Sequence, residues 1–203
     1  MKRYQAAFLF LLLLAKVVTA QNADINLLRK INANQKPFST GLANLLSPSV
    51  NIIPAALHGG LYFYGTAKKN EPLRQAQFLS VSSEVLAVGI TYGLKYSVKR
   101  PRPYITYPFL KTNKTHKDPS FPSGHATLAF AFATNTMLYG HKWYYTVPAY
   151  AWAAGVAWSR MYKGVHYPSD VLGGAIVGTA LPLAVYFLKN HFIAAGRKVH
   201  LLN

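Results

Sequence analysis

The chain has 203 residues, about one domain, and hydrophobic residues make up 51% of it against 13% charged residues. This composition excludes an intrinsically disordered chain. Lysine and arginine number 22 against five acids, a net charge of +17, and the chain has no cysteine. So few carboxylates argue against magnesium or two-metal sites, and the lack of thiols excludes iron–sulfur clusters and disulfides. We expect a protein without metal or cofactor and with an anionic partner.

Residues 1–20 predict an export signal. Lys2 and Arg3 precede an apolar run over residues 6–15, and small residues at 18–20 suit cleavage before residue 21. The alternative is a first transmembrane helix, although Lys16 ends the run before the length of about 20 residues that a span needs. Both interpretations place the following residues on the exported side of a membrane.

The remaining chain divides into a polar N-terminal stretch at 21–45, a helical domain at 46–190 and a basic tail at 191–203. Five apolar segments of the domain lack the alternation of strands and are rich in alanine, leucine and glycine, which favours helices. They cover residues 50–67, 77–94, 125–140, 143–158 and 171–188. We therefore expect an all-α bundle of about five to six helices.

The bundle is expected to be embedded in a membrane, because each apolar segment is close to the shortest helix that spans a bilayer. Gly174 and Gly178 have the small-xxx-small spacing that lets a neighbouring helix approach closely. A soluble helical bundle remains the alternative, because His58, Glu84 and Asn135 lie inside these segments. Apolar segments separated by basic residues do not resemble a nucleic-acid-binding face, and nothing in the sequence indicates a protein partner.

The positive-inside rule gives a topology for the membrane-embedded bundle. Lys68, Lys69 and Arg74 fall in one short connection, which we place in the cytoplasm. The two long polar connections, 95–124 and 159–170, then share the exported face. These two connections hold the residues with the most unusual chemistry.

The first connection is strongly basic, with seven lysines and arginines and one acid between positions 95 and 118. Lys95 is followed after six residues by Arg102 and Pro103. Arginine offers a planar fork of donors to phosphate, and lysine adds a point charge. A basic cluster attracted to anionic lipid headgroups is an equally good interpretation of this stretch alone.

The same connection ends in Pro122, Ser123, Gly124 and His125, directly before an apolar helix. Ser123 is a natural N-cap, Gly124 allows close backbone approach, and free N–H groups at a helix start bind anions. His125 is placed to donate a proton to such an anion. For the tetrapeptide alone, a capping serine beside an incidental histidine is the favoured interpretation.

The second connection contains Arg160, His166 and Asp170. Asp170 precedes a glycine-rich helix and could serve only as a cap or a first-turn charge. In the functional interpretation, its carboxylate fixes one imidazole nitrogen of His166 and leaves the other as an oriented lone pair. A histidine held in this way can attack phosphorus and form a covalent intermediate.

Together the three elements resemble the type 2 phosphatidic acid phosphatase family, which shares its site with vanadium haloperoxidases and bacterial class A acid phosphatases. The family signature is Lys-x6-Arg-Pro, Pro-Ser-Gly-His and Ser-Arg-x5-His-x3-Asp. The chain matches all eleven specified positions, in order, between residues 95 and 170. A chance match of this length is very improbable.

The resemblance implies a role for each matched position. His166 is implied to be the nucleophile, Asp170 its orienting acid, and His125 the general acid and later the base. The phosphate oxygens are implied to be held by five residues of the signature: Lys95, Arg102, Ser123, Gly124 and Arg160. Cations in these places supply the charge stabilisation that phosphoryl transfer needs, without a metal.

The function expected from these residues is a metal-independent phosphatase that hydrolyses a phosphomonoester or pyrophosphate, most simply of a lipid phosphate, through a phosphohistidine. The expected location is the bacterial inner membrane, with the site facing the periplasm. One alternative is a soluble periplasmic acid phosphatase of broad specificity. Another is a membrane protein that binds phospholipid headgroups without turnover, although binding alone needs no nucleophile.

Overall fold

The computed structural model describes residues 21–112 and 116–200, so the predicted export signal at 1–20 lies outside the described residues. The described chain is all-α, as predicted, with six helices and the single-turn helix α5. The helices are α2 (Gln21–Ala33), α3 (Pro37–Ala67), α4 (Glu71–Val98), α5 (Pro103–Thr106), α6 (Gly124–Gly140), α7 (Trp143–Tyr162) and α8 (Pro168–His200).

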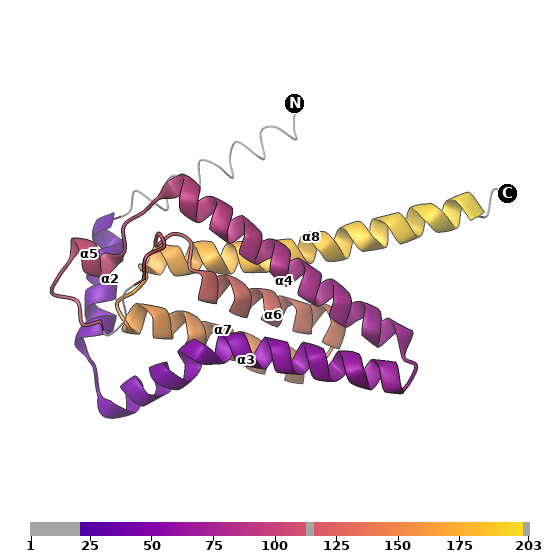
Figure 1. Ribbon diagram of the computed structural model, residues 1–203, viewed down its shortest axis with the longest axis horizontal. Coiled ribbons are helices and arrows are strands. Elements are labelled where there is room, and N and C mark those ends of the chain that lie inside the picture. Colours follow the sequence, from indigo (N-terminus) through magenta and orange to yellow (C-terminus); the bar gives the residue numbers. More distant parts are fainter. Residues whose placement is uncertain (1–20, 113–115, 201–203) are drawn as a thin grey trace.

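Helix α6 lies at the centre of the bundle (Figure 1). Its most extensive contacts are with α8 and α7, and it also packs against α4 and α3. Helices α2 and α5 lie together at one end of the bundle, and α8 extends beyond the bundle at the other (Figure 1). We call the end with α2 and α5 the capped end. The helices that meet there bring distant parts of the sequence together.

All five predicted apolar segments are helical, but several helices are longer than the segments. The polar stretch 21–45 forms α2 and the start of α3, where Pro37 occupies a first-turn position that proline favours. Residues 191–200 of the basic tail continue α8. Positions 45 and 190 therefore both lie inside helices. Apolar patterning identified only the parts of the helices that pack against neighbours. The polar turns at the ends of the same helices have no apolar periodicity, so the sequence did not predict them as helical.

Two glycines allow the closest helix contact, between α6 and α8. A Cβ added to Gly174 would lie 2.5 Å from the Ser123 carbonyl oxygen, and one added to Gly178 would lie 2.2 Å from that of Thr127. Both distances are far shorter than van der Waals contact. The predicted close approach at this glycine pair is confirmed, and it places the first turn of α8 against the start of α6.

A buried polar cluster lies inside the bundle, away from the capped end. The ring nitrogens of His58 are 2.7 Å from Gln77 Oε1 and 2.9 Å from Glu84 Oε1. Asn135 donates to the same Glu84 oxygen at 3.1 Å. These side chains bond to one another, which satisfies polar groups that would otherwise be costly inside an apolar bundle.

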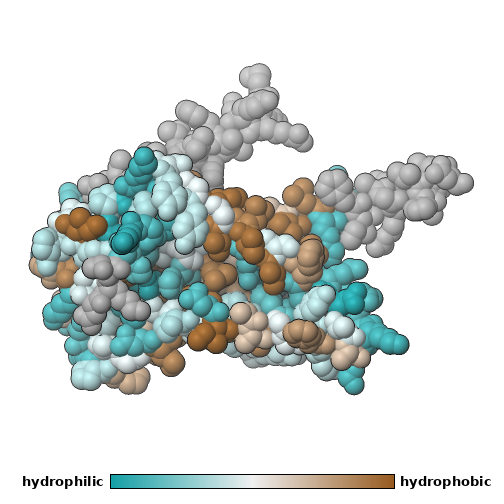
Figure 2. Space-filling model, viewed as in Figure 1, coloured by the Kyte–Doolittle hydropathy of each residue, from teal (hydrophilic) through white to brown (hydrophobic). Residues whose placement is uncertain are grey.

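The surface divides into hydrophilic and hydrophobic zones. Hydrophilic side chains gather at the capped end, and hydrophobic side chains form a zone across the middle of the molecule (Figure 2). The exposed large hydrophobic side chains of the molecule include Phe63, Phe78, Val85 and Phe187, each more than half exposed. One stretch of the described residues, Pro168–His191 in α8, is long and apolar enough to cross a membrane, with a mean hydropathy of 2.0.

The glycine contact predicts a specific loss of stability. Gly178→Ala forces a methyl group into the Thr127 backbone, and overpacking of this kind costs about 1–3 kcal/mol. We expect the midpoint of thermal unfolding in detergent to fall by roughly 2–12 °C, at about 2–4 °C per kcal/mol for a chain of this size. Gly89→Ala in α4 is the matched control, because its Cβ meets nothing within 4 Å and alanine is the better helix former. Equal midpoints for the two variants would contradict this account of the packing.

Candidate active site

The three signature elements meet at the capped end of the bundle. Lys95 lies in the last turn of α4, and Arg102 follows the helix directly before α5. Ser123 immediately precedes α6, and Arg160 lies in the last turn of α7. His166 lies in the short connection from α7 to α8, and Asp170 is in the first turn of α8. Helix ends, rather than long loops, therefore hold most of the site.

His166 is buried, and its two ring nitrogens face different partners. Nε2 lies 3.3 Å from Arg102 Nη1, and Nδ1 lies 3.5 Å from Asp170 Oδ2. A guanidinium can only donate hydrogen bonds, so Nε2 must carry the lone pair and Nδ1 the proton. The free nitrogen that the sequence analysis required of a nucleophile is therefore Nε2, and the Nδ1–H group faces Asp170.

Asp170 is fully buried and is held by several donors. Its Oδ2 accepts from the Tyr167 backbone N–H at 2.8 Å and from the Ser120 hydroxyl, and its Oδ1 accepts from Arg100 at 2.7 Å. One carboxylate thus accepts a backbone hydrogen bond at the start of α8 and lies opposite Nδ1 of His166. The Ser123 backbone N–H also donates to the Asp170 carbonyl at 2.9 Å, which ties the second signature element to the third.

Lys95 and Arg102 share one carboxylate in this structure. Lys95 Nζ lies 2.9 Å from Asp118 Oδ2, and Arg102 Nη2 donates to Asp118 Oδ1 at 2.8 Å. Both cations are buried, whereas the Asp118 side chain is 29% exposed. The two carboxylate oxygens bind the cations that the resemblance assigns to two phosphate oxygens. Asp118 therefore shows where an anion is stabilised in this site.

Burial and neighbouring charges shift the pKa values of Asp118 and His166 in the site. Burial alone would raise the pKa of Asp118, but the neighbouring Lys95 and Arg102 cations outweigh it and lower the pKa to about 2. Burial lowers the pKa of His166 well below its ordinary value, and the positive charges of Arg102, Arg160 and Lys95 lower it further. The His166 ring is therefore neutral, which is the form that can attack phosphorus.

Arg160 and Ser123 carry donors without partners. Arg160 donates through Nη1 to the Ser47 hydroxyl and lies 3.4 Å from His116 Nε2, but its Nε–H has no partner. Ser123 occupies the N-cap position of α6 as predicted, but the expectation that its hydroxyl caps the helix is wrong. Among the described residues, three buried side-chain polar atoms lack a hydrogen bond: Ser123 Oγ, Arg160 Nε and His166 Nδ1.

Gly124 and His125 form the first turn of α6 beside these groups. A Cβ on Gly124 would meet nothing within 4 Å, so there is open space beside its backbone. The charged or titratable groups that act on His125 include Arg160, His166 and His116. The structure thus brings His125 to the same cluster as the other signature residues, at a helix start suited to an anion.

Several residues of the site were not singled out by the sequence analysis. Asp24, Arg100, Asp118 and Ser120 all bond to signature residues or to their direct partners. Arg100 was noted only as part of a basic stretch. The scarcity of acids was a usable signal, because Asp24 and Asp118 are two of only five. Their partners are distant in sequence or lie across a loop, so spacing alone did not pair them.

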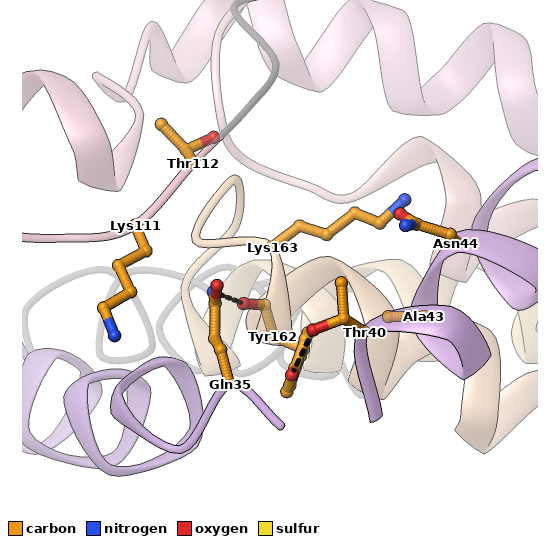
Figure 3. Close-up of a pocket in the computed structure, with 8 residues that line it drawn as sticks. All are labelled: Gln35, Thr40, Ala43, Asn44, Lys111, Thr112, Tyr162 and Lys163. Carbon is orange, nitrogen blue, oxygen red and sulfur yellow. Dashed lines mark hydrogen bonds between the residues drawn. The ribbon is translucent and has the colours of Figure 1, made fainter. Parts of the chain in front are cut away.

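The part of the chain that the structure describes contains no group of three or more His, Asp or Glu side chains placed to hold a metal ion. A small cavity of about 60 Å³ lies where the connection from α2 to α3 meets the end of α7 (Figure 3). Gln35 donates to the Tyr162 carbonyl at 3.3 Å, and the Thr40 and Tyr162 hydroxyls lie 2.9 Å apart. The cavity has room for a few waters and not for a lipid headgroup.

Comparisons with known proteins agree with this site. The model of the PAP2 superfamily matches residues 78–193, which include every signature position. An Escherichia coli protein provisionally named an undecaprenyl-diphosphatase is 33% identical over 162 residues, 78% of each chain. A lipid A 4′-phosphatase of Porphyromonas gingivalis is 27% identical over 191 residues, 86% of this chain and 78% of its own.

A solved structure has the same fold. The crystal structure of a transmembrane phosphatidylglycerolphosphate phosphatase of the PAP2 type from Bacillus subtilis superposes with a TM-score of 0.67 at 25% identity. The match covers 94% of this chain and 98% of that one, so nearly the whole helical arrangement is shared. The chain therefore belongs to the PAP2 superfamily and is a phosphatase of that family.

Proposed function

We propose that the chain hydrolyses a lipid phosphate or diphosphate through a phosphohistidine on His166, without a metal ion. The unpartnered donors of Ser123 and Arg160 are the observation that carries the proposal. A buried donor without a partner costs about 1–3 kcal/mol. Both donors lie in a cluster of cations with the lone pair of a neutral histidine, so a bound phosphate would satisfy them at the nucleophile.

In the first half of the reaction, His166 Nε2 attacks phosphorus and forms a P–N bond while the bond to the leaving oxygen breaks. Burial and the nearby Arg160 and His166 lower the pKa of His125 to about 2. The negative charge of a bound phosphate raises this pKa, so that His125 is protonated and gives its proton to the leaving oxygen. The imidazole gains positive charge as the P–N bond forms, and the buried Asp170 carboxylate opposite Nδ1 stabilises that charge. Lys95, Arg102 and Arg160 stabilise the negative charge on the equatorial oxygens.

In the second half, water attacks the phosphohistidine. His125, now neutral, takes the proton of the water as the P–O bond forms and the P–N bond breaks. Inorganic phosphate leaves, and His166 returns to its neutral form. Substrate phosphate must also replace Asp118 at Lys95 and Arg102, and the partial exposure of this carboxylate gives it room to move away.

The similar proteins support a lipid substrate. The names of the relatives refer to undecaprenyl diphosphate and to lipid A, and each relative covers more than three quarters of this chain. We place undecaprenyl diphosphate first, because the identity to the Escherichia coli protein is higher, and a lipid A phosphate second.

Exposed apolar side chains support a location in the bacterial inner membrane. A soluble monomer seldom exposes as many large apolar residues as the middle of this bundle does. Lys68 and Lys69 follow α3 at the turn into α4, so they lie at the opposite end of these helices from Lys95. We place this end in the cytoplasm and the site in the periplasm, because the predicted export signal would carry the following helix α2, which lies at the site end, to the exported side.

The substrate is tested by phosphate release from purified protein in detergent with EDTA present. We expect turnover of undecaprenyl diphosphate to exceed that of lipid A, phosphatidylglycerophosphate and the soluble ester p-nitrophenyl phosphate. EDTA should leave the rate unchanged, because cationic side chains, rather than a metal ion, stabilise the negative charge on the phosphate oxygens. A rate that disappears in EDTA and returns with magnesium would falsify the metal-free mechanism. A preference for the soluble ester, with release of the protein by osmotic shock, would favour the periplasmic alternative.

Removal of the nucleophile is the second test. His166→Asn should reduce kcat by at least about a thousandfold, because no other group near the phosphate can form the covalent intermediate. His141→Asn is the matched control: this exposed histidine caps α6 at its far end with φ 54°, a conformation that asparagine tolerates, and the rate should stay unchanged. Phosphate labelling that is stable to alkali and labile to acid identifies the phosphohistidine intermediate, and labelling that survives His166→Asn would contradict the assignment.

The lowered pKa of His166 predicts its protonation state. A group with a lowered pKa stays neutral down to a lower pH, so His166 should remain unprotonated at about pH 6.5, where an ordinary histidine is half protonated. Nitrogen NMR of protein labelled at histidine checks this, with His166→Asn to assign the signals. The expected spectrum shows a neutral ring with its proton on Nδ1. A His166 titration centred at or above pH 6.5 would be the contrary result.

A further inference from the structure

We propose that Asp24 of α2 is a positioning residue for the reaction: through Arg100 it fixes the orientation and the effective charge of Asp170. The inference rests on the proposed function, because Asp170 matters only if His166 is the nucleophile. It adds a residue outside the signature and outside residues 78–193, which the family model matches. Asp24 touches neither phosphate nor His166 and acts through other groups.

Arg100 joins two buried carboxylates. Its Nη1 donates to Asp170 Oδ1 at 2.7 Å, and its Nη2 donates to Asp24 Oδ2 at 2.9 Å. The guanidinium carbon also lies 3.9 Å from the centre of the Tyr167 ring, so the plane of the group is held by stacking. All three charged side chains are less than a tenth exposed. Water therefore does little to screen the charges from one another.

Asp24 also binds the helix that carries Asp170. Its Oδ1 accepts from the Ser169 backbone N–H at 3.0 Å, and its Oδ2 accepts from the Ser169 hydroxyl. The first N–H groups of a helix have no partner within the helix, and here one partner comes from α2. Asp24 thus fixes both the cation next to Asp170 and the backbone immediately before it.

The charge of Asp24 has a consequence for catalysis. If Arg100 faced Asp170 alone, its positive charge would neutralise the carboxylate that must stabilise the His166 imidazolium. With Asp24 on its other side, Arg100 is shared between two carboxylates, and the three groups together keep one negative charge. The negative charge near Asp170 can then stabilise the positively charged phosphohistidine, while Arg100 still fixes the position of the Asp170 carboxylate.

The buried pair of Glu84 and His58 shows what a purely structural acid looks like in the same protein. Glu84 is as buried as Asp24 and is also held by hydrogen bonds, but its partners are His58 and Asn135 inside the bundle. None of these residues belongs to the site. Glu84→Gln is therefore the matched control for Asp24→Asn, since both changes remove one buried negative charge and keep the shape of the side chain.

The test measures kcat and KM of Asp24→Asn and Glu84→Gln on the same lipid substrate. Activity is divided by the concentration of sites that bind vanadate, an analogue of pentacoordinate phosphorus, so that unfolded protein does not count. We expect Asp24→Asn to lower kcat about ten- to hundredfold with KM within about threefold of the parent. Glu84→Gln should keep kcat within about twofold, and Asp24→Glu should recover part of the lost rate.

The outcomes separate this inference from the proposed function. If the parent turns over and His166→Asn does not, the function stands, and an unchanged kcat in Asp24→Asn would overturn the positioning role alone. An equal fall in kcat for Glu84→Gln would also overturn it. If the parent releases no phosphate, both proposals fail. If Asp24→Asn gives no folded protein, Ser169→Ala removes one contact of Asp24 with α8, and a selective fall in kcat is again required.

Discussion

The shortage of carboxylates is the constraint on which the architecture of this site depends. Five cationic or titratable groups that face a phosphate cannot be packed closely without compensating charge, and the chain has only five acids. Three of them, Asp24, Asp118 and Asp170, lie in the site. Asp24 and Asp170 bind the buried Arg100, whereas the more exposed Asp118 binds Lys95 and Arg102, the cations that we propose bind the substrate. The buried acids Asp24 and Asp170 thus make structural contacts, whereas the contacts of Asp118 can be replaced by those of a phosphate.

Close helix packing makes this arrangement rigid. The glycines of α8 let its backbone touch that of α6, and the Ser123 N–H group bonds to the Asp170 carbonyl at the same place. The second and third signature elements are therefore fixed to each other by backbone contacts. Side chains held by these backbone contacts keep their geometry without filling the space between them, and we propose that phosphate binds in that space.

Much of the fold and site could be predicted from the sequence. Apolar segments gave the helices of the bundle, glycine spacing gave the contact of α6 with α8, and the signature spacing gave the residues that meet at the capped end. The helical nature of 21–33 was not predicted, because that stretch is polar and packs through few side chains. Asp24 and Arg100 were missed for a related reason: their contact joins residues 76 positions apart, and local patterns contain no such information.

The contact of α2 with α8 joins parts of the chain that are far apart in the sequence. Asp24 and Ser169 are 145 positions apart, so this contact closes a loop that includes most of the bundle. Contacts of such long range form late, after the intervening helices are in place. A partly synthesised chain would carry the first two signature elements but not the histidine and carboxylate that complete the site. We expect the site to be complete only once α8 has packed against α2 and α6.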